Sequence, residues 1–335
     1  MSGKTGFFFP QETLRELREA AEFLRRHDDI LVVSHVNPDG DAIGSTLAAG
    51  WLLGRMGKSY VMANQDAVPS KFGFLPNADR IVRSAELAGR APFRAAVFVD
   101  CADRARAGDA AGLLSPDAAI LNIDHHATND RFGTQALVMP DASATCEMLW
   151  HLIGVSGEEA DASVGECIYT GILTDTGGFR YSNTSRNVMI LAAELLGLGV
   201  QGHVLAERLL ETMTYAQIEL LKRGLQTLEF ACGRRVAYVS VTLKDLQELR
   251  TDSSDLDGLV NYARNVAGVE VGLLFRQDAE DKVKVSFRSR GQVDVSRVAG
   301  AFGGGGHVRA SGATVAGTLE EVRKAVLREV ELALE

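Results

Sequence analysis

The chain has few cysteines, and they form no recognisable thiol site. It contains 4 cysteines in 335 residues, and no two of them make a Cys-x-x-Cys pair. This scarcity excludes a disulfide framework and favours a reducing compartment. No apolar run approaches the roughly 18 residues of a membrane span, and residues 1–10 lack the pattern of a secretory signal. We therefore expect a cytoplasmic protein with no membrane partner.

Positive charge is also in deficit. The sequence carries 35 Lys and Arg against 44 Asp and Glu, a formal net charge of -9. A negative field repels long nucleic acid, so we expect no long duplex as a partner, although a local basic groove is still allowed. At 46% hydrophobic and 24% charged residues, the composition is that of a folded chain, and the length predicts two domains.

Short apolar runs alternate with helical patterns in the first part of the chain. The runs 30–33, 97–99 and 120–123 predict strands, and the patterns between and around them predict helices over 11–26, 41–53, 143–153, 161–174 and 186–197. This alternation predicts an α/β domain over residues 1–200, with a parallel sheet and flanking helices.

The pattern changes after residue 200. Residues 201–230 predict a helical linker, rich in Leu and charge. A smaller α/β domain with a mixed sheet is expected over 231–335. Its predicted strands are 236–241, 269–275 and 282–287, the last two forming a hairpin, and its predicted helices are 256–266, 294–301 and 318–334.

Acidic and imidazole side chains follow each of the three early strands. They are His35, Asp39 and Asp41 after the first, Asp100 after the second, and Asp124, His125 and His126 after the third. Taken alone, residues 34–45 fit an ordinary turn with a helix cap as well as they fit a site. The recurrence favours a site, because the carboxyl ends of parallel strands share one edge of a sheet.

Carboxylates gathered in this way repel one another unless cations lie between them. Oxygen and imidazole ligands without a thiolate suit Mn²⁺, with Mg²⁺, Co²⁺ and Zn²⁺ as alternatives, and their number allows two ions that share a carboxylate. Two such ions would activate a hydroxide near neutral pH. Asp175, which precedes a pair of glycines, is either a turn carboxylate at a helix end or a further ligand.

A glycine-rich segment lies in the second domain. Residues 303–306 are four consecutive glycines, followed by His307 and Arg309. Such a backbone can approach an anion closely, and Arg can bind phosphate through two donors. Six Lys and Arg between Lys282 and Arg309 predict a basic face; a flexible linker is the alternative. A P-loop is excluded, because no Gly-Lys-Ser/Thr follows the glycines.

Together these motifs resemble the DHH phosphoesterase superfamily, and within it the NrnA type, which joins a DHH domain to a DHH-associated domain. The matching segments are His35-x-Asn-Pro-Asp39-Gly-Asp41, Asp100, Asp124-His125-His126, Thr-Asp175-Thr-Gly, Asp257-Gly-Leu-Val-Asn261, Val285-Ser-Phe-Arg288-Ser-Arg290 and Gly303-Gly-Gly-Gly-His307-x-Arg309-Ala-Ser-Gly. They span nearly the whole chain. One small departure is Arg309-Ala-Ser-Gly, where the family usually has Arg-Ala-Ala-Gly.

The resemblance implies a role for each residue. One metal would bind His35, Asp39 and Asp100. The other would bind Asp41, Asp100, His125 and Asp175, so that Asp100 bridges the two. Asp124 would orient the histidines and His126 would contact the scissile phosphate. The residues that correspond to the substrate-binding pocket are Arg288, Ser289, Gly305, Gly306, His307 and Arg309.

The resemblance also implies a function. A cytosolic hydrolase using two Mn²⁺ would cleave oligonucleotides of two to four nucleotides to mononucleotides and would dephosphorylate 3′-phosphoadenosine 5′-phosphate. A phosphodiesterase of cyclic di-AMP or of its linear dinucleotide is an alternative. A non-catalytic nucleotide sensor is an alternative of another class. By analogy a homodimer is a candidate assembly, although no sequence pattern marks an interface.

Overall fold

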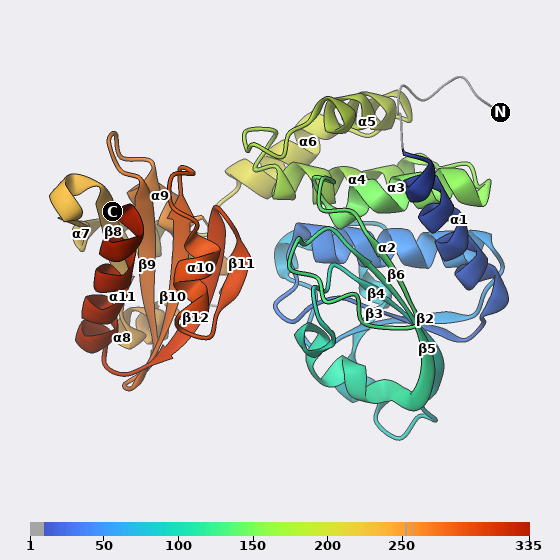
Figure 1. The fold of residues 1–335 in the computed structure, drawn as a ribbon, viewed down its shortest axis with the longest axis horizontal. Helices are drawn as coiled ribbons and strands as arrows, with labels where there is room; N and C mark the ends of the chain where they lie inside the picture. The colour runs from blue at the N-terminus through green and yellow to red at the C-terminus, as the bar shows by residue number, and fades with distance from the viewer. Residues whose placement is uncertain (1–9, 252, 257) are drawn as a thin grey trace. The chain divides into compact units, whose positions relative to one another are not determined.

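A computed structural model describes residues 10–251, 253–256 and 258–335. The chain divides into two compact units, Met1–Thr212 and Met213–Glu335, here called the first and second units. Each unit has its own six-stranded sheet. In Figure 1 the chain is coloured by residue number, from blue at the N-terminus to red at the C-terminus. Asp257, which belongs to one of the family motifs, lies outside the described residues. The predicted helical linker over 201–230 stays a prediction.

The first unit contains more strands than the sequence revealed. Its strands are β1 (Ile30–Val33), β2 (Tyr60–Asn64), β3 (Ile81–Arg83), β4 (Phe93–Val99), β5 (Leu114–Asp124) and β6 (Gln135–Val138). Its helices are α1 (Gln11–Arg26), α2 (Gly40–Arg55), α3 (Thr145–Ser156), α4 (Ala162–Asp175), α5 (Arg186–Gly197) and α6 (Gly202–Ala206). Shorter helical turns are η1 (Ser70–Phe72), η2 (Ala78–Arg80), η3 (Ser84–Leu87), η4 (Arg104–Leu113) and η5 (Glu207–Glu211).

The sheet of the first unit is entirely parallel, as predicted. Its strand order is β3-β2-β1-β4-β5-β6, and every neighbouring pair runs in the same direction. The chain builds the sheet outward from β1 in one direction and from β4 in the other. In such sheets ligands bind beyond the carboxyl ends of the strands, at the point where the strand order changes direction. The loops after β1 and β4 are therefore the expected place for a site.

Alternating side chains of β1 fill two cores, one on each face of this sheet. Ile30 and Val32 pack on the face covered by α1 to α5, whereas Leu31 and Val33 pack on the face covered by η4. A strand buried on both faces reads as a continuous apolar run, which is why β1 was recognisable. Strand β3 has only three residues, and β6 begins with Gln135 and is buried only in its second half, so neither gives such a run.

The second unit is built on a mixed sheet, which the sequence also predicted. Its strands are β7 (Glu229–Ala231), β8 (Val236–Val241), β9 (Val271–Ala279), β10 (Lys282–Ser289), β11 (Gly305–His307) and β12 (Ala310–Ala316). Its helices are α7 (Tyr215–Gln226), α8 (Leu243–Leu249), α9 (Leu259–Arg264), α10 (Val295–Gly300) and α11 (Leu319–Leu334), with the turns η6 (Cys232–Arg234) and η7 (Ser253–Leu256). The predicted helix 256–266 is thus shorter than expected.

In this sheet the strand order is β11-β12-β10-β9-β8-β7. Only β8 and β9 run parallel, and β9 and β10 form the predicted hairpin. Helices α10 and α11 pack on one face, and α7 and α9 pack on the other face over β8 and β9. The glycine-rich segment forms the edge strand β11, so one side of its backbone is not used by the sheet.

Within the described ranges, no single helix has the length and apolar character of a membrane span. Only α5 taken together with residues 202–211 meets those criteria, and the two parts are bent by 116° from one another.

Candidate metal centre

Three strands bring the predicted residues of the first unit to one edge of its sheet. His35 lies two residues beyond β1, Asp100 follows β4 directly, and Asp124 is the last residue of β5. Asp39 caps the start of α2, where its Oδ1 accepts hydrogen bonds of 3.1 Å from the backbone N–H groups of Asp41 and Ala42. Asp39 is therefore a helix cap, as one interpretation of this segment predicted, and its role as a metal ligand stays a prediction.

Asp100 lies at the centre of the cluster. It is only 2% exposed, and its carboxylate faces three imidazoles. Oδ2 is 3.3 Å from His35 Nε2, while Oδ1 is 3.7 Å from His125 Nε2 and 3.6 Å from His126 Nδ1. The backbone of Asp100 is left-handed, with φ of 57°. Such strain in a residue other than glycine is typical of functional sites, and Asp tolerates it better than most residues.

Among the groups of side chains that could hold a cation, two together contain the six predicted ligands. The first is His35, Asp39 and Asp100, and the second is Asp41, His125 and Asp175; within each group the candidate ligand atoms lie within 4.8 Å of one another. Nε2 of His125 is 3.4 Å from the Asp175 carboxylate and 3.9 Å from that of Asp41. Asp175 is the last residue of α4. The structure therefore gathers all six predicted ligands at one edge.

The amino terminus of α3 anchors Asp41, a contact that the sequence did not reveal. The backbone N–H of Thr145 donates to Oδ2 at 2.6 Å, and that of Cys146 donates to Oδ1 at 2.9 Å. A helix N-terminus offers free N–H groups and a favourable dipole to an anion. The hydroxyl of Thr145 also lies 3.3 Å from Asp100 Oδ1. These residues are more than 100 positions from Asp41, so only the fold could reveal the contact.

Backbone carbonyls set the orientation of two imidazoles. Nδ1 of His35 is 2.8 Å from the carbonyl of Val36, and Nδ1 of His125 is 3.2 Å from that of Ala142. A carbonyl only accepts, so each Nδ1 carries a hydrogen and each Nε2 is directed at the carboxylates. Such bonds to the far nitrogen are typical of histidines that bind metals.

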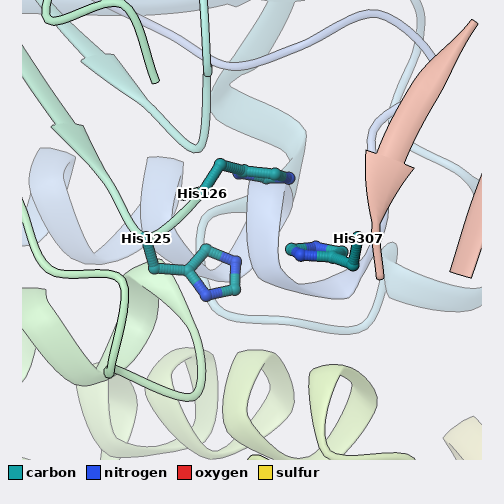
Figure 2. Close-up of side chains that lie close together, drawn as sticks. All are labelled: His125, His126 and His307. Carbon is teal, nitrogen blue, oxygen red and sulfur yellow. The ribbon is translucent and has the colours of Figure 1, made fainter. Parts of the chain in front are cut away.

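His126 differs from its neighbour, because its partner is a carboxylate. The Nδ1 atom of His126 is 2.8 Å from Oδ1 of Asp124, which is fully buried. The rings of His125 and His126, drawn in Figure 2, have centroids 4.9 Å apart and are inclined at 68°. The two successive histidines therefore present their rings in different orientations.

The electrostatics of the cluster fit a cation site. Burial, together with the charge of Asp100, raises the pKa of Asp41 to about 7, and burial raises the pKa of Asp175 well above its usual value. Burial lowers the pKa of His125, but Asp175 and Asp100 outweigh it and bring the pKa to about 9. The protein alone thus holds protons that a divalent cation would replace. Carboxylate oxygen and imidazole nitrogen are the ligands that Mn²⁺, Mg²⁺ and Co²⁺ accept.

A buried polar network supports the loop that positions His125. The carboxylate of Glu147 accepts from both the N–H and the hydroxyl of Ser143, at 2.7 and 2.8 Å. Asn183 donates to the carbonyls of Ser143 and Asp175, at 3.1 and 3.2 Å. It thereby connects the loop that holds His125 to the end of α4. No sequence pattern marked Glu147 or Asn183, because they act only through tertiary contacts.

The predicted anion-binding residues of the second unit lie on and beside an exposed edge strand. Gly305, Gly306 and His307 form β11 and pair with β12. A Cβ at Gly304 would lie 2.2 Å from the carbonyl oxygen of Gly312, so only glycine lets the two backbones approach this closely. Gly306 has φ of 139°, which also favours glycine. The segment is therefore an ordered strand and not a flexible linker.

Arg288 and Ser289 do not present their side chains to the same face. They are successive residues of β10, and successive side chains of a strand point to opposite faces. Ser289 is 1% exposed and its hydroxyl has no hydrogen-bond partner, whereas Arg288 is partly exposed. The N–H of Ser289 donates to the carbonyl of Arg309 at 3.0 Å. The guanidinium of Arg309 packs over Gly291, where a Cβ would lie 2.7 Å from it.

The predicted basic face is only partly present. Lys282, Lys284 and Arg288 alternate along β10 and share the face opposite the core that Val283 and Val285 enter. Arg297 lies on α10, which packs on that core and so covers the other face. The expectation of one basic face from all six cations was therefore wrong, because sequence proximity does not determine on which side of a sheet a helix packs.

Comparisons with known proteins agree with this geometry. The DHH family N-terminal domain matches residues 29–172, and the DHHA1 domain matches residues 233–335. A bifunctional oligoribonuclease and PAP phosphatase NrnA from Thermus thermophilus is 37% identical over 318 residues, covering 94% of this chain and 93% of the relative. The chain belongs to the DHH family of NrnA type. It is therefore a phosphoester hydrolase, as the sequence motifs predicted.

Two further proteins extend the comparison. The NrnA of Bacillus subtilis is 27% identical over 307 residues, covering 86% of this chain and 90% of the relative. An exopolyphosphatase-related protein from Bacteroides fragilis has a solved structure with a TM-score of 0.87 and 27% identity, covering 97% of this chain and 98% of that one. The architecture of both units is thus shared with a DHH-family structure over nearly the whole length.

Proposed function

We propose that this protein is a two-metal hydrolase that degrades oligonucleotides of two to four nucleotides and dephosphorylates 3′-phosphoadenosine 5′-phosphate. The observation that carries the proposal is the pair of candidate ligand groups whose imidazoles both face Asp100, in a chain 37% identical to a relative named for both activities. Mn²⁺ is the proposed cofactor, with Mg²⁺ and Co²⁺ as alternatives, because the ligands are oxygens and imidazoles without thiolate.

The first proposed ligand set is the first of the two groups, and the second set adds Asp100 to the second group. His35, Asp39 and Asp100 would hold one cation. The other would be held by Asp41, Asp100, His125 and Asp175. Two bound cations supply a water of lowered pKa and neutralise charge on the phosphoryl oxygens. Asp100, with an oxygen toward each group, is the proposed bridge.

His126 is the proposed contact to the scissile phosphate. Its Nδ1 is 2.8 Å from Asp124 Oδ1, so Asp124 sets the direction of the ring, and Nε2 is the proposed contact atom. A hydrogen-bond donor held at this position would stabilise the negative charge that builds on a phosphoryl oxygen during displacement. Asp124 is thus the proposed positioning partner of His126.

The second unit is the proposed substrate holder. Arg288 and Arg309 supply charge-assisted donors for phosphate, and the exposed strand of Gly305, Gly306 and His307 supplies backbone and ring donors. Ser289, whose side chain is buried, supports this segment through its N–H bond to Arg309. A net charge of -9 disfavours long nucleic acid, which fits a short substrate.

A substrate panel tests the proposal. Purified protein with Mn²⁺ is incubated with a 5′-phosphorylated RNA dinucleotide, a 20-mer, 3′-phosphoadenosine 5′-phosphate and cyclic di-AMP, and the products are separated by chromatography. We expect rapid release of mononucleotide from the dinucleotide, release of phosphate from the bisphosphate, and slow attack on the 20-mer. A variant with Asp100→Ala is the negative control.

The other outcomes identify the alternatives. Consumption of cyclic di-AMP alone would place the protein in second-messenger turnover. Binding of nucleotides without any turnover, in protein that also binds Mn²⁺, would indicate a sensor that keeps the family fold.

A further inference from the structure

Asn129 lies in the loop after β5 at the centre of a set of acceptors that no proposed role explains. Its Nδ2 is 2.6 Å from Asp124 Oδ2, 2.9 Å from Asn122 Oδ1 and 3.1 Å from the carbonyl of Cys101. Its Oδ1 accepts from the N–H of Arg131 at 2.6 Å, so the orientation of the amide is fixed. The amide therefore has its donor side directed at three acceptors.

One of these contacts leads to His126. Asp124 uses its two oxygens for different partners, Oδ2 for Asn129 and Oδ1 for the Nδ1 of His126. Asp124 is fully buried, so a donor that holds Oδ2 also fixes the direction of Oδ1. Asn129 thereby controls the orientation of the His126 ring through one intervening carboxylate.

Another contact leads to Asp100. The carbonyl of Cys101, the next residue, receives hydrogen bonds from the amides of both Asn122 and Asn129, at 3.0 and 3.1 Å. Asp100 itself is left-handed, with φ of 57°, and its N–H donates to the carbonyl of Ile123 at 3.0 Å. A strained residue keeps its conformation only where its surroundings hold it. Two amides on the adjacent carbonyl supply such a constraint.

We propose that Asn129 is a positioning residue, whose side-chain amide simultaneously orients His126 through Asp124 and fixes the left-handed backbone of Asp100 through the carbonyl of Cys101. The expected effect on kcat rests on the proposed function. This role makes the loop after the Asp124-His125-His126 segment part of the machinery, and it couples the proposed bridge to the proposed phosphate contact.

Two substitutions separate a donor role from a packing role. Asn129→Leu keeps the branched shape and removes both polar atoms. Asn129→Asp keeps the shape and the acceptor for Arg131, but directs an oxygen at the three acceptors. If Asn129 only filled space, both variants would resemble the wild type. Thr128→Ala, at the exposed neighbouring position, is the matched control.

The experiment measures steady-state kinetics on 3′-phosphoadenosine 5′-phosphate and Mn²⁺ affinity by electron paramagnetic resonance of the free ion. We expect Asn129→Leu to lower kcat by roughly 10- to 100-fold, with KM within about twofold, and to weaken Mn²⁺ binding by about tenfold. Asn129→Asp should be at least as impaired. Thr128→Ala should match the wild type in both measurements. Circular dichroism checks the folding of each variant, and Asn129→Leu carries the test if Asn129→Asp does not fold.

Several results would overturn the inference. One is that kcat and Mn²⁺ affinity of Asn129→Leu both stay within twofold of the wild-type values. Another is a rise in KM at unchanged kcat, which would indicate that Asn129 contacts the substrate instead. If wild type and Thr128→Ala hydrolyse nothing, the proposed function fails, and Mn²⁺ affinity alone decides the inference. Weakened binding in Asn129→Leu then supports the constraint on Asp100, and unchanged binding refutes the inference.

Discussion

The two units carry functional residues in opposite environments. In the first unit the candidate ligands Asp41, Asp100 and His125 are buried and joined by hydrogen bonds to loops and helix ends. In the second unit Gly305, His307 and their neighbours lie on an exposed edge strand. A buried charged cluster needs both a rigid frame and compensating charge, whereas an exposed edge needs neither.

This difference separates two kinds of contribution to catalysis. Residues fixed before substrate arrives act mainly on the chemical step, because they are already placed for the transition state. Exposed cations and backbone donors act mainly on binding. Changes in the first unit should therefore affect kcat and metal affinity, and changes in the second unit should affect KM.

The largest effect is expected at Asp100. Asp100→Ala removes the proposed bridge between the two cations, so we expect kcat to fall by at least about a thousandfold and Mn²⁺ binding to weaken. Asp117→Ala, at the opposite end of the same sheet where Asp117 pairs with Arg94 on the surface, is the control and should match the wild type. Substantial residual turnover by Asp100→Ala with saturating Mn²⁺ would contradict the bridging role.

A smaller effect is expected at Arg309, and in KM. Loss of a charge-assisted bond to phosphate should raise KM of Arg309→Ala by roughly 10- to 100-fold while Mn²⁺ affinity stays unchanged. Arg297→Ala, from the same basic segment but on the helix that covers the other face, should have no effect. A fall in kcat at constant KM would remove the distinction between the two units.

A change in the backbone of the edge strand should have a still smaller effect. Gly304→Ala places a Cβ 2.2 Å from the carbonyl of Gly312, so the two backbones must separate. Because overpacking of this kind costs about 1–3 kcal/mol, we expect KM to rise up to roughly tenfold. Gly300→Ala, where a Cβ meets nothing within 4 Å, is the matched control. Equal kinetics for the two variants would show that the close approach is not needed.

The smallest effect concerns stability only. Burial lowers the pKa of His151 in α3 to about 4. Between about pH 6.5 and pH 4 the unfolded chain takes up a proton that the folded chain does not, so stability is lost as pH falls and is complete above pH 6.5. In metal-free protein His151→Leu should avoid up to about 3 kcal/mol of this loss.

Urea unfolding at pH 7 and pH 5 measures this difference. The exposed His203→Leu should keep the acid sensitivity of the wild type. If His151→Leu loses as much stability on acidification as His203→Leu does, the burial of His151 has no such consequence. Catalytic activity at pH 8 should be the same in all three proteins.

Sequence patterns predicted most of the fold and the residues that cluster at the candidate metal centre. Gln11–Arg26 has a helical period and Ile30–Val33 is a continuous apolar run, and both were predicted with these bounds. The clustering of Asp and His residues after these strands could also be predicted, because the carboxyl ends of parallel strands lie at one edge of the sheet. Short strands such as Ile81–Arg83 were missed, since three residues carry too little pattern.

The supporting residues could not be predicted in the same way. Asn129, Thr145 and Asn183 act through contacts with distant backbone atoms, and Asn and Thr are also common in ordinary turns. The prediction of one basic face was wrong for a related reason. Arg297 is close to Arg288 in sequence, but its helix packs on the other side of the sheet. The direction in which each of these side chains points could not be predicted from the sequence.

The most direct test of the account is anomalous diffraction at the manganese edge from crystals grown with Mn²⁺. We predict two peaks, one in contact with His35, Asp39 and Asp100 and the other with Asp41, Asp100, His125 and Asp175. The absence of any peak at this edge of the sheet, or a single peak at saturating Mn²⁺, would contradict the claim that Asp100 bridges two cations.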